Sequence, residues 1–311
     1  MNGLKLIATG RALPENILTN DDMARYVETS DEWISTRTGI KTRCFCGENE
    51  SAATLAVEAA KKALESANLT AQDIDVMVLA TSSGETVMPS TACTVHGALG
   101  MRESIPVMDV GAACAGFLYA LEVARSLMIA GSGTRAMVIG TEKMSGVLDM
   151  ADRNTCVLFG DGAGAAIFEL DAQGEYVSDF GTRAGMQIIV GGPRREQPMT
   201  MEGQDVFRFA TRIIPECAGR LLEKAGLTVD SVDHIVCHQA NQRILDASMR
   251  RLGVGPEKMF KNLDRYANTS AASIPIALDE MRETGVLASG QRVILCGFGG
   301  GLTWGGVLMT L

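Results

Sequence analysis

The sequence predicts an α/β protein built from two related halves. Short apolar stretches that suit buried strands alternate along the chain with amphipathic stretches of helical spacing. Glycine is enriched, at 34 of 311 residues, while aromatic residues make up only 5%, a composition typical of folds with many tight strand–helix turns. Segments of the second half also repeat segments of the first in the same order, which indicates an internal duplication.

The first half is expected to alternate strands and helices. Ser, Thr and Asn residues directly before helical patterns serve as N-caps, and proline is favoured in the first helical turn. The expected elements are a strand at 4–9, a short helix capped by Thr19 or Asn20 and running through Val27, another capped by Ser30 and running through Ile34, an amphipathic helix at 51–67, a strand at 74–80, a helix at 89–99 and a strand at 105–110.

The duplication predicts a boundary near the middle of the chain. Equivalent stretches are residues 69–78 and 227–236, residues 133–140 and 290–297, and the glycine-rich turns at 159–164 and 298–301. We therefore expect two halves, residues 1–172 and 173–311, packed about a pseudo-twofold axis so that equivalent loops converge in the middle. Residues 174–205 have no counterpart and are interpreted as a connection between the halves.

Composition restricts the function class. A net charge of −9 argues against broad nucleic-acid binding. The eight cysteines are unevenly spaced and include no Cys-x-x-Cys motif, so we expect reduced thiols in a cytoplasmic protein, with no disulfide framework and no metal site. The N-terminus lacks a signal-peptide pattern. Residues 293–311 are uncharged, but their glycines divide them into two short strands around a turn, so we expect no membrane span.

Cys114 is the first candidate catalytic residue. It follows the apolar run 105–110 and precedes a pattern of helical spacing from Phe117 to Met128, which places it at the start of a helix. Unpaired backbone N–H groups and the positive end of the helix dipole favour a thiolate at that position. The alternative is a buried structural thiol, because free cysteine is among the most buried residue types.

His238 and Asn268 lie at comparable strand ends in the second half. His238 follows the expected strand at 233–237, and Asn268 leads into a helix whose small residues allow close packing. Taken singly, His238 would be a partly buried histidine with its hydrogen bonds satisfied, and Asn268 a helix N-cap.

Four segments, taken together and in order, resemble the β-ketoacyl-[acyl-carrier-protein] synthase III family. They are residues 109–121 around Cys114, residues 238–243, residues 268–275 and the glycine-rich residues 297–305, and the likeness extends to residues 29–40 and 152–155. The resemblance implies the thiolase-like fold, a five-layered αβαβα sandwich of two βαβαβαββ halves, in a homodimer. It also implies the initiating condensation of fatty acid synthesis.

The resemblance implies a ping-pong mechanism that fits these residue types. Cys114 would take the acyl group from an acyl-CoA primer, most simply acetyl-CoA, as a thioester. Malonyl-acyl carrier protein would then lose CO₂ and attack the acyl-Cys to give a 3-oxoacyl product. His238, neutral in this step, and Asn268 would donate hydrogen bonds to the developing enolate. The backbone N–H groups of Cys114 and Gly300 would form the oxyanion hole for acyl transfer. Acyl-CoA is a substrate, and no permanently bound cofactor is implied.

The family resemblance also implies two binding regions at the entrance. Trp33, Arg37 and Arg153 would hold the adenine of coenzyme A by stacking, with Gly203 and Gln204 along the pantetheine arm. The acidic acyl carrier protein would meet a basic patch. The residues implied for carrier binding are Gln239, Ala240, Asn241, Gln242, Arg243, Arg208, Arg250 and Arg251. Without the resemblance, Trp33 would be interpreted as a cover of the core, and Arg37 and Arg153 as members of surface ion pairs. The carrier-binding arginines would be interpreted as a solvated helix face.

Some positions depart from the common family pattern and leave the primer open. Met88 stands where an aromatic residue of the neighbouring subunit often closes the primer pocket, and Phe207 lies near the tunnel. Met88 is flexible, so chains longer than acetyl can be admitted. The alternatives are an acyl-CoA-dependent transferase or ketosynthase of specialised metabolism, a non-catalytic partner subunit, and a thiolase whose second cysteine would be Cys296.

Overall fold

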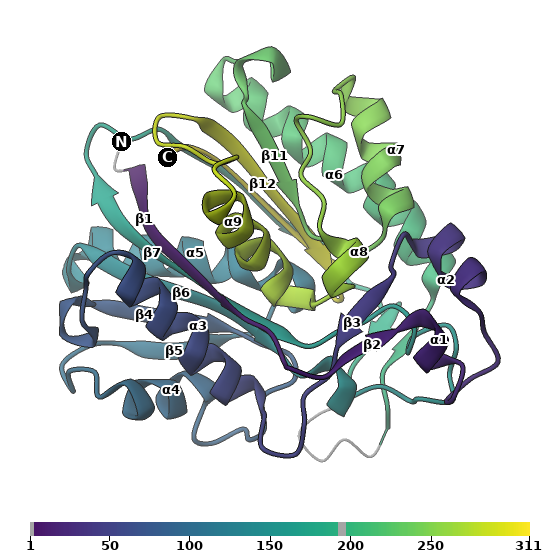
Figure 1. Ribbon diagram of the computed structural model, residues 1–311. Helices are drawn as coiled ribbons and strands as arrows, with labels where there is room; N and C mark the ends of the chain where they lie inside the picture. The colour runs from purple at the N-terminus through teal and green to yellow at the C-terminus, as the bar shows by residue number, and fades with distance from the viewer. Residues whose placement is uncertain (1–2, 192–196) are drawn as a thin grey trace.

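Two β-sheets alternate with three layers of helices in the computed structural model, which describes residues 3–191 and 197–311 (Figure 1). The connection at 174–205 therefore includes five residues, 192–196, that lie outside the described part. The first sheet has the order β1-β7-β6-β4-β5, and the second has the order β11-β12-β13-β8. This is the expected five-layered α/β sandwich of two related halves.

The first sheet is mixed. Strand β4 pairs in parallel with β5 and β6, whereas β7 pairs antiparallel with β6 and β1. Its strands are β1 (Gly3–Ala12), β4 (Val76–Ala80), β5 (Val107–Val110), β6 (Arg135–Glu142) and β7 (Gly162–Asp171).

The second sheet repeats this arrangement with four strands. Strand β12 pairs in parallel with β11 and antiparallel with β13, which pairs antiparallel with β8. The equivalent of β5 is reduced to a single bridge between Ile235 and Met259, so the described residues of the second half lack the fifth strand that an exact repeat would have. The strands are β8 (Tyr176–Thr182), β11 (His234–Cys237), β12 (Arg292–Gly299) and β13 (Thr303–Thr310).

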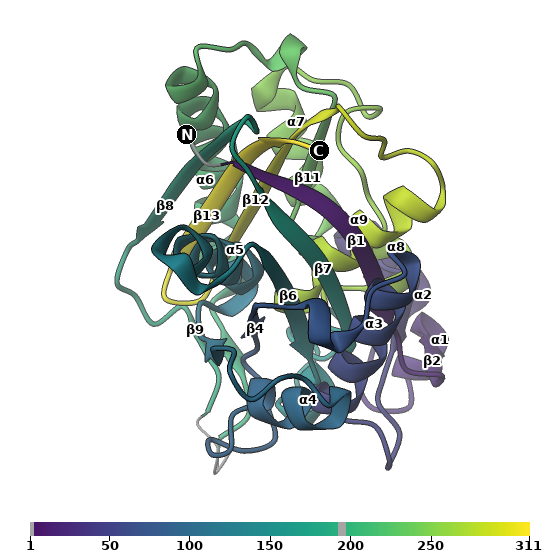
Figure 2. The same cartoon turned by 90° about the vertical axis from the view of Figure 1, so that its left-hand side faces the viewer.

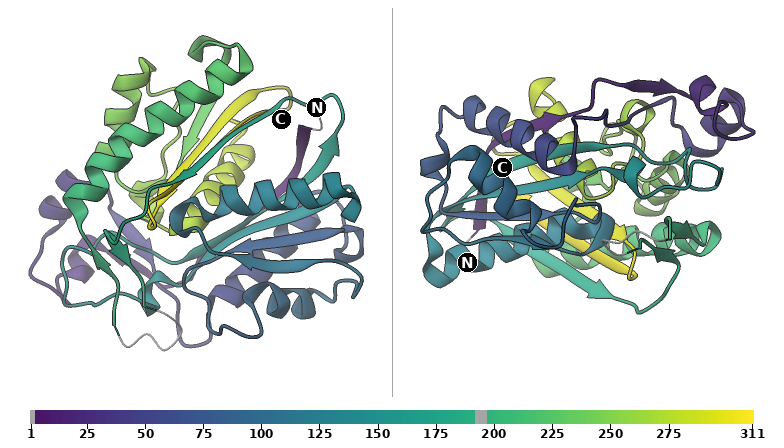
Figure 3. Two further views of the ribbon diagram at one scale, coloured as in Figure 1. Left: turned by 180° about the vertical axis from the view of Figure 1, so that it is seen from behind. Right: turned by 90° about the horizontal axis from the view of Figure 1, so that it is seen from below.

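Helices cover both outer faces and fill the space between the sheets. The outer layers are α3 (Ala52–Ser66) with α4 (Thr91–Leu99), and α6 (Gly203–Ala225) with α7 (Gln242–Leu252) (Figure 2). The middle layer is α5 (Gly116–Leu127) with α9 (Ser273–Glu283), each preceded by a short turn of helix, η2 (Ala113–Ala115) and η6 (Ser270–Ala272). Figure 3 shows α5 running between the two sheets.

Smaller elements connect or flank these strands and helices. They are β2 (Ile17–Thr19), α1 (Asn20–Met23), α2 (Asp31–Thr38), β3 (Thr42–Cys44), η1 (Ala71–Asp73), the π-turn η3 (Met128–Ser132), η4 (Met144–Gly146), β9 (Ile188–Ile189), β10 (Thr200–Met201), η5 (Val229–Ser231) and α8 (Leu263–Tyr266).

The expected N-caps are confirmed. Thr19 and Ser30 accept the backbone N–H of the third helical residue of α1 and α2, and Ser51 does the same for α3. Two expected helix ends were wrong. Helix α1 ends at Met23 rather than Val27, and α2 continues past Ile34 to Thr38.

Part of the hydrophobic core is shared by the two halves. One buried cluster combines Phe117 and Leu121 of α5 with Ile274 of α9, Val138 of the first sheet and Leu295 of the second. The expected boundary at 172/173 lies between β7 and β8, where the chain passes from one sheet to the other.

Residues 113–132 form the one helical stretch of the described residues that is long and apolar enough to cross a membrane by length and composition alone. In the fold, its central helix α5 packs against β4 and β6 on one side and against β12 and β13 on the other. The run 293–311 forms the two expected strands, β12 and β13.

Candidate active site

A cavity of about 570 Å³ opens between the two halves and is lined by Cys114, His238 and Asn268. The first residue comes from the turn before α5, and the other two come from loops of the second half. Gly299 and Gly300, at the end of β12, also line the cavity. The three side chains selected from separate sequence segments therefore line one cavity.

Cys114 lies in the turn η2, at the N-terminal end of α5. The preceding Ala113 has φ of 47°, a left-handed conformation that costs an alanine about 1–2 kcal/mol. A Cβ atom on Gly299 would lie 2.6 Å from the backbone nitrogen of Cys114, so only glycine allows this approach of β12. Burial raises the pKa of the Cys114 thiol to about 12, although the hydrogen bond between the Cys114 and Ser270 side chains acts in the opposite direction.

His238 follows β11 and is buried. Its backbone N–H donates to the carbonyl of Cys296 at 2.8 Å, and its ring meets the edge of Phe298 at 5.4 Å between centroids. Burial lowers the pKa of the imidazole to about 3, so the ring is neutral at physiological pH. Ring nitrogen Nδ1 is hydrogen-bonded to Oγ of Ser273 at 2.7 Å.

Asn268 is held on both sides by the backbone of the segment 158–160. Its N–H donates to the carbonyl of Leu158, and its carbonyl accepts the N–H of Gly160, both at 3.0 Å. The side-chain oxygen Oδ1 accepts the backbone N–H of Ser270 at 2.9 Å. Because this bond engages the oxygen, it orients the carboxamide and leaves its N–H₂ group as the free donor.

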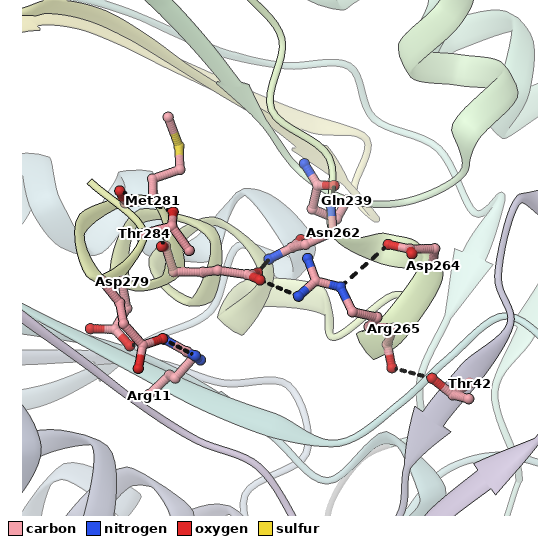
Figure 4. Close-up of polar contacts among 11 residues, drawn as sticks. Arg11, Thr42, Gln239, Asn262, Asp264, Arg265, Asp279, Met281 and Thr284 are labelled. Carbon is pink, nitrogen blue, oxygen red and sulfur yellow. Dashed lines mark hydrogen bonds and ion pairs between the residues drawn. The ribbon is translucent and has the colours of Figure 1, made fainter. Parts of the chain in front are cut away.

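A buried polar network supports the loops that carry His238 and Asn268 (Figure 4). The side chain of Gln239 donates to the carbonyl of Cys237 and accepts the backbone N–H of Asn262. The Asn262 amide in turn donates to Glu280 of α9, which also forms an ion pair with Arg265. The network ties both loops to the middle helical layer.

The structure corrects the expected role of Gln239. Its side chain is 1% exposed and is fully engaged inside the protein, so a carrier protein cannot contact it. Ala240 is also nearly buried and lines the cavity. Of the expected segment 239–243, Asn241, Gln242 and Arg243 reach the surface.

The residues expected to hold coenzyme A gather at the mouth of the cavity. Trp33, Arg37 and Arg153 line it, as do Gly203 and Gln204 at the start of α6. The guanidinium carbons of Arg37 and Arg153 lie 4.5 and 4.6 Å from the centre of the Trp33 ring. An adenine that stacks on Trp33 would therefore have to replace one of these two cation–π contacts.

A second, smaller depression adjoins the mouth. We call it the basic groove, and it is lined by Phe207, Thr211, Arg243, Asp246, Ala247, Arg250 and Arg251. Phe207 lines both the basic groove and the main cavity, and Arg243 lies over its ring at 5.7 Å. Arg208 is exposed outside the groove and forms an ion pair with Asp205.

Met88 does not line the cavity of its own chain. Its side chain is 86% exposed and its neighbour Val87 is 63% exposed. The apolar inner wall is formed instead by residues that the sequence did not single out, namely Met144, Phe159, Ile188, Val190 and Met199. They come from η4, the turn before β7, β9 with the residue after it, and the residue before β10, so only the fold brings them together.

Three polar residues of the site were also missed from the sequence. Ser270 and Ser273 lie in the segment that was quoted for Asn268, and both contact the candidate catalytic residues. Glu142, at the end of β6, is buried and accepts a hydrogen bond from Ser270. A carboxyl at the end of a buried strand was the signal that could have identified Glu142.

Metal binding has no support in the part of the chain that the structure describes, because it contains no group of three His, Cys, Asp or Glu residues that could hold an ion. All eight cysteines are free thiols, and Cys296 lies inside β12 and is buried. Cys296 also does not line the main cavity, a position that disfavours the thiolase alternative.

Comparison with known proteins gives a consistent family. Two sequence models, 3-Oxoacyl-[acyl-carrier-protein (ACP)] synthase III and the C-terminal model of the same name, match residues 108–184 and 222–311. The chain is 44% identical to a β-ketoacyl-[acyl-carrier-protein] synthase III of Rhizorhabdus wittichii, covering 96% of this chain and 97% of the relative. A synthase III of Clostridium perfringens is 42% identical over 100% of both chains.

Solved structures agree in fold over the whole chain. The 3-oxoacyl-[acyl-carrier-protein] synthase III of Aquifex aeolicus is 41% identical, with a TM-score of 0.94 over 99% of this chain and 100% of that structure. The priming β-ketosynthase of the R1128 polyketide pathway is 32% identical, with a TM-score of 0.92 over 99% of this chain and 96% of that structure.

Proposed function

The chain belongs to the β-ketoacyl-[acyl-carrier-protein] synthase III family, and from this premise we propose that Cys114, His238 and Asn268 carry out its condensation reaction. The protein is a condensing acyltransferase that initiates fatty acid synthesis. One observation supports the residue assignment above all: three side chains from three distant segments line a single cavity.

In the first half-reaction, the Cys114 sulfur attacks the thioester carbonyl of an acyl-CoA primer. A tetrahedral oxyanion forms and collapses to acyl-Cys114 and free coenzyme A. The backbone N–H groups of Cys114 and Gly300 are the proposed donors to this oxyanion. Their proximity is supported by the approach of Gly299 to Cys114, which brings the end of β12 against the nucleophile turn.

In the second half-reaction, malonyl-acyl carrier protein loses CO₂ and the resulting carbanion attacks the acyl-Cys114 thioester. Decarboxylation builds negative charge on the malonyl thioester oxygen, and an imidazole and a carboxamide are suited to stabilise it. The Ser273 hydroxyl accepts the N–H of Gln239 at 3.3 Å and can donate its own proton to Nδ1 of His238. The imidazole proton then resides on Nε2, which makes His238 a neutral hydrogen-bond donor.

The substrates are bound by different parts of the mouth. We assign the nucleotide of acyl-CoA to Trp33, Arg37 and Arg153, and the pantetheine arm to Gly203 and Gln204. Stacking and cation–π contacts suit an adenine ring. We assign the acidic carrier protein to the basic groove and to Arg208, because complementary charge steers such a partner to the cavity entrance. Thiol, imidazole and amide suffice for the chemistry, so no resident cofactor is proposed.

The working assembly is proposed to be a cytoplasmic homodimer. Val87 and Met88 expose apolar side chains away from the cavity of their own chain, as expected if they close the pocket of a neighbouring subunit. Equilibrium sedimentation of the purified chain at micromolar concentration tests this. A monomer at all concentrations would exclude the dimer.

The function is tested by mass spectrometry of the intact protein after exposure to acetyl-, isobutyryl- and longer acyl-CoA. We expect an adduct on Cys114 with at least one of these primers, and a 3-oxoacyl product once malonyl-acyl carrier protein is added. Cys114→Ala, in which the thiol is absent, is the matched control. If no primer loads the wild-type chain, the assignment of Cys114 is wrong.

A second candidate function follows from the likeness to the R1128 priming β-ketosynthase. That relative primes a polyketide pathway, so this chain could begin a specialised product with a primer other than acetyl. The ratio of loading rates for acetyl-CoA and longer acyl-CoA distinguishes the two. A strong preference for acetyl-CoA would favour fatty acid synthesis, and rejection of acetyl-CoA would favour the second candidate.

A further inference from the structure

A buried carboxyl lies behind the nucleophile and is not used by the mechanism above. Glu142, the last residue of β6, is 0% exposed. An ionised carboxylate without partners would not be tolerated at such a position, so its contacts indicate which state it occupies. Strand β6 is the central strand of the first sheet (Figure 1).

One oxygen of Glu142 is held by the segment that follows β4. Oε2 accepts the backbone N–H of Ser82 at 3.0 Å and the hydroxyl of Thr81 at 3.3 Å, and it is also hydrogen-bonded by Ser83. These donors fix the carboxylate and favour its charged form. A backbone N–H cannot act as an acceptor, so the Ser82 contact requires an unprotonated oxygen at this position.

The other oxygen of Glu142 points to the nucleophile through a single hydroxyl. Oγ of Ser270 donates to Oε1 at 2.9 Å, and the same side chain is hydrogen-bonded to Cys114. Close approach of β6 to η6 holds this arrangement, because a Cβ atom on Gly140 would lie 2.2 Å from the carbonyl oxygen of Ala271. The Ser270 hydroxyl therefore lies between the Cys114 thiol and the Glu142 carboxylate.

Ser270 is held by its backbone independently of this hydroxyl. Its φ is 49°, and its N–H donates to Asn268. A serine kept in the left-handed region at a cost of about 1–2 kcal/mol must be fixed by its surroundings. Its hydroxyl can still rotate, and can donate either to Glu142 or to Cys114.

We propose that Glu142 is the proton acceptor for Cys114 during acyl loading, with the Ser270 hydroxyl as the relay between them. This rests on the proposed role of Cys114 as nucleophile. The thiol proton passes to Oγ of Ser270 while the Ser270 proton passes to Oε1 of Glu142. Ser270 is then a catalytic residue, and Glu142 is a positioning residue that acts through it.

The proton balance closes over both half-reactions. The Cys114 thiolate forms a C–S bond to the acyl carbonyl, the bond to coenzyme A breaks, and the coenzyme A thiolate takes a proton from water. When the carbanion later attacks, the bond from the acyl carbon to Cys114 breaks and the sulfur leaves as thiolate. It then recovers its proton from Glu142 through Ser270, which regenerates the thiol and the carboxylate.

The electrostatics of the site are consistent with a proton that Cys114 and Glu142 share. Burial raises the pKa of Glu142, and burial together with the Glu142 charge raises the pKa of Cys114. The Glu142 charge acts on Cys114, and the contacts of this carboxyl are hydroxyl and N–H groups of 81–83 and 270–271. His238, neutral down to about pH 3, does not compete for the proton.

The test separates the two half-reactions. In Glu142→Gln, the buried side chain keeps its shape but cannot accept the proton, so acyl loading at pH 7 should fall about 10²-fold, within the range of general-base catalysis. Ser270→Ala should lose loading similarly, because it removes the relay and keeps the backbone N–H that orients Asn268. Decarboxylation of malonyl-acyl carrier protein, which needs no thiol proton transfer, should stay within about threefold of wild type in both.

The pH profile supplies a readout that a structural role would not change. Wild-type loading should decline as the pH falls through the raised pKa of Glu142. In Glu142→Gln, that inflection should vanish, and the rate should rise about tenfold per pH unit with ionisation of the thiol alone. Arg212→Ala, a surface arginine of α6 that lines neither the cavity nor the basic groove, is the matched control, and its loading rate and pH profile should equal those of wild type.

The outcomes are distinct. If the wild-type chain loads a primer and the Glu142→Gln variant loads it equally fast, the proposed relay is wrong and the role of Cys114 stands. A parallel loss of loading and decarboxylation would identify Glu142 as structural and also overturn it. Failure of the wild-type chain to load any primer would overturn the role of Cys114 itself.

Discussion

The two turns at the centre of the molecule have the same backbone and different chemistry. η2 leads into α5 and η6 leads into α9, each at the equivalent place in its half, and each begins with a left-handed residue, Ala113 or Ser270. The next residue is Cys114 in the first turn and Ala271 in the second. The duplicated fold thus supplies two equivalent turns, of which one carries a nucleophile and the other carries donors and a hydroxyl.

The duplicated fold therefore positions the two turns, while individual side chains determine which chemistry each turn performs. Both turns strain one residue to bring a helix start to the centre, and both are closely approached by a strand of the opposite half, β12 against η2 and β6 against η6. The halves differ in the side chains added to that frame. Predictions that alter one turn should therefore affect one half-reaction.

Cys114→Ala should have the largest effect on activity. It tests whether the first turn, η2, does anything besides carry the nucleophile. Condensation should fall by on the order of 10⁴-fold or more because no thioester can form. Malonyl decarboxylation should continue, since His238 and Asn268 are unaltered. Product formation and CO₂ release measured on the same sample check this. Loss of both activities would mean that the two turns are not chemically separate.

Asn268→Ala tests the second turn. Removing one of the two proposed donors to the enolate oxygen should slow decarboxylation about 10²–10³-fold. Loading of Cys114 by acyl-CoA should persist, because its oxyanion donors come from Cys114 and Gly300. Intact-mass measurement of the acyl adduct, alongside CO₂ release, decides the matter. A variant that no longer loads would contradict the separation.

Ser273→Ala tests how His238 is kept as a donor. Without the Ser273 hydroxyl, the imidazole loses its partner at Nδ1, and we expect decarboxylation to slow about tenfold. The wild-type rate should show no imidazole inflection between pH 5 and 8, because burial lowers the His238 pKa to about 3 and the ring gains a proton only near that value. An inflection near pH 6.5 that follows His238 would show a charged ring in the reaction.

The comparison can be extended to the mouth, where the first half contributes Trp33. Trp33→Ala should raise the KM for acyl-CoA about tenfold, because both cation–π contacts and the stacking surface are lost. The rate with saturating primer and the KM for malonyl-acyl carrier protein should stay near wild type. Arg212→Ala, a surface arginine of α6 that does not line the cavity or the basic groove, is the control.

The second half contributes the basic groove, where the smallest effect is expected. Arg250→Glu should slow association with the acidic carrier protein a few-fold at low salt, with the difference shrinking at high salt as charges are screened. Acyl-CoA loading should not change. Stopped-flow association at two ionic strengths measures the effect, and an equal loss at both would argue against electrostatic steering.

Local features of the fold could be predicted from the sequence because their causes are local. The N-caps at Thr19, Ser30 and Ser51 form within one helical turn, and the apolar runs that became β4 and β5 need no distant partner to be recognised. The fifth strand of the second half could not be anticipated in the same way. Its loss depends on how residues around Met259 meet β11.

Some residues of the candidate site could likewise be predicted from the sequence, and others could not. Cys114, His238 and Asn268 stand in motifs that can be compared with a family, whereas the bond between Ser270 and Glu142 joins residues 128 positions apart. No periodicity links them, because the contact exists only when η6 packs against the end of β6. Gln239 was expected at the surface because it precedes a surface helix in the sequence. In the structure its side-chain amide is hydrogen-bonded to backbone groups inside the protein.

The core cluster that runs through both sheets and the middle layer has a consequence for denaturation. Since α5 and α9 belong to the same packed interior, denaturant cannot melt one half and leave the other intact. The arrangement of Cys114, His238 and Asn268 should therefore be lost in one cooperative unfolding transition. Tryptophan fluorescence and thiol reactivity should change at the same denaturant midpoint. A chain cut at the link between β7 and β8 would regain a catalytic centre only when both fragments are present together.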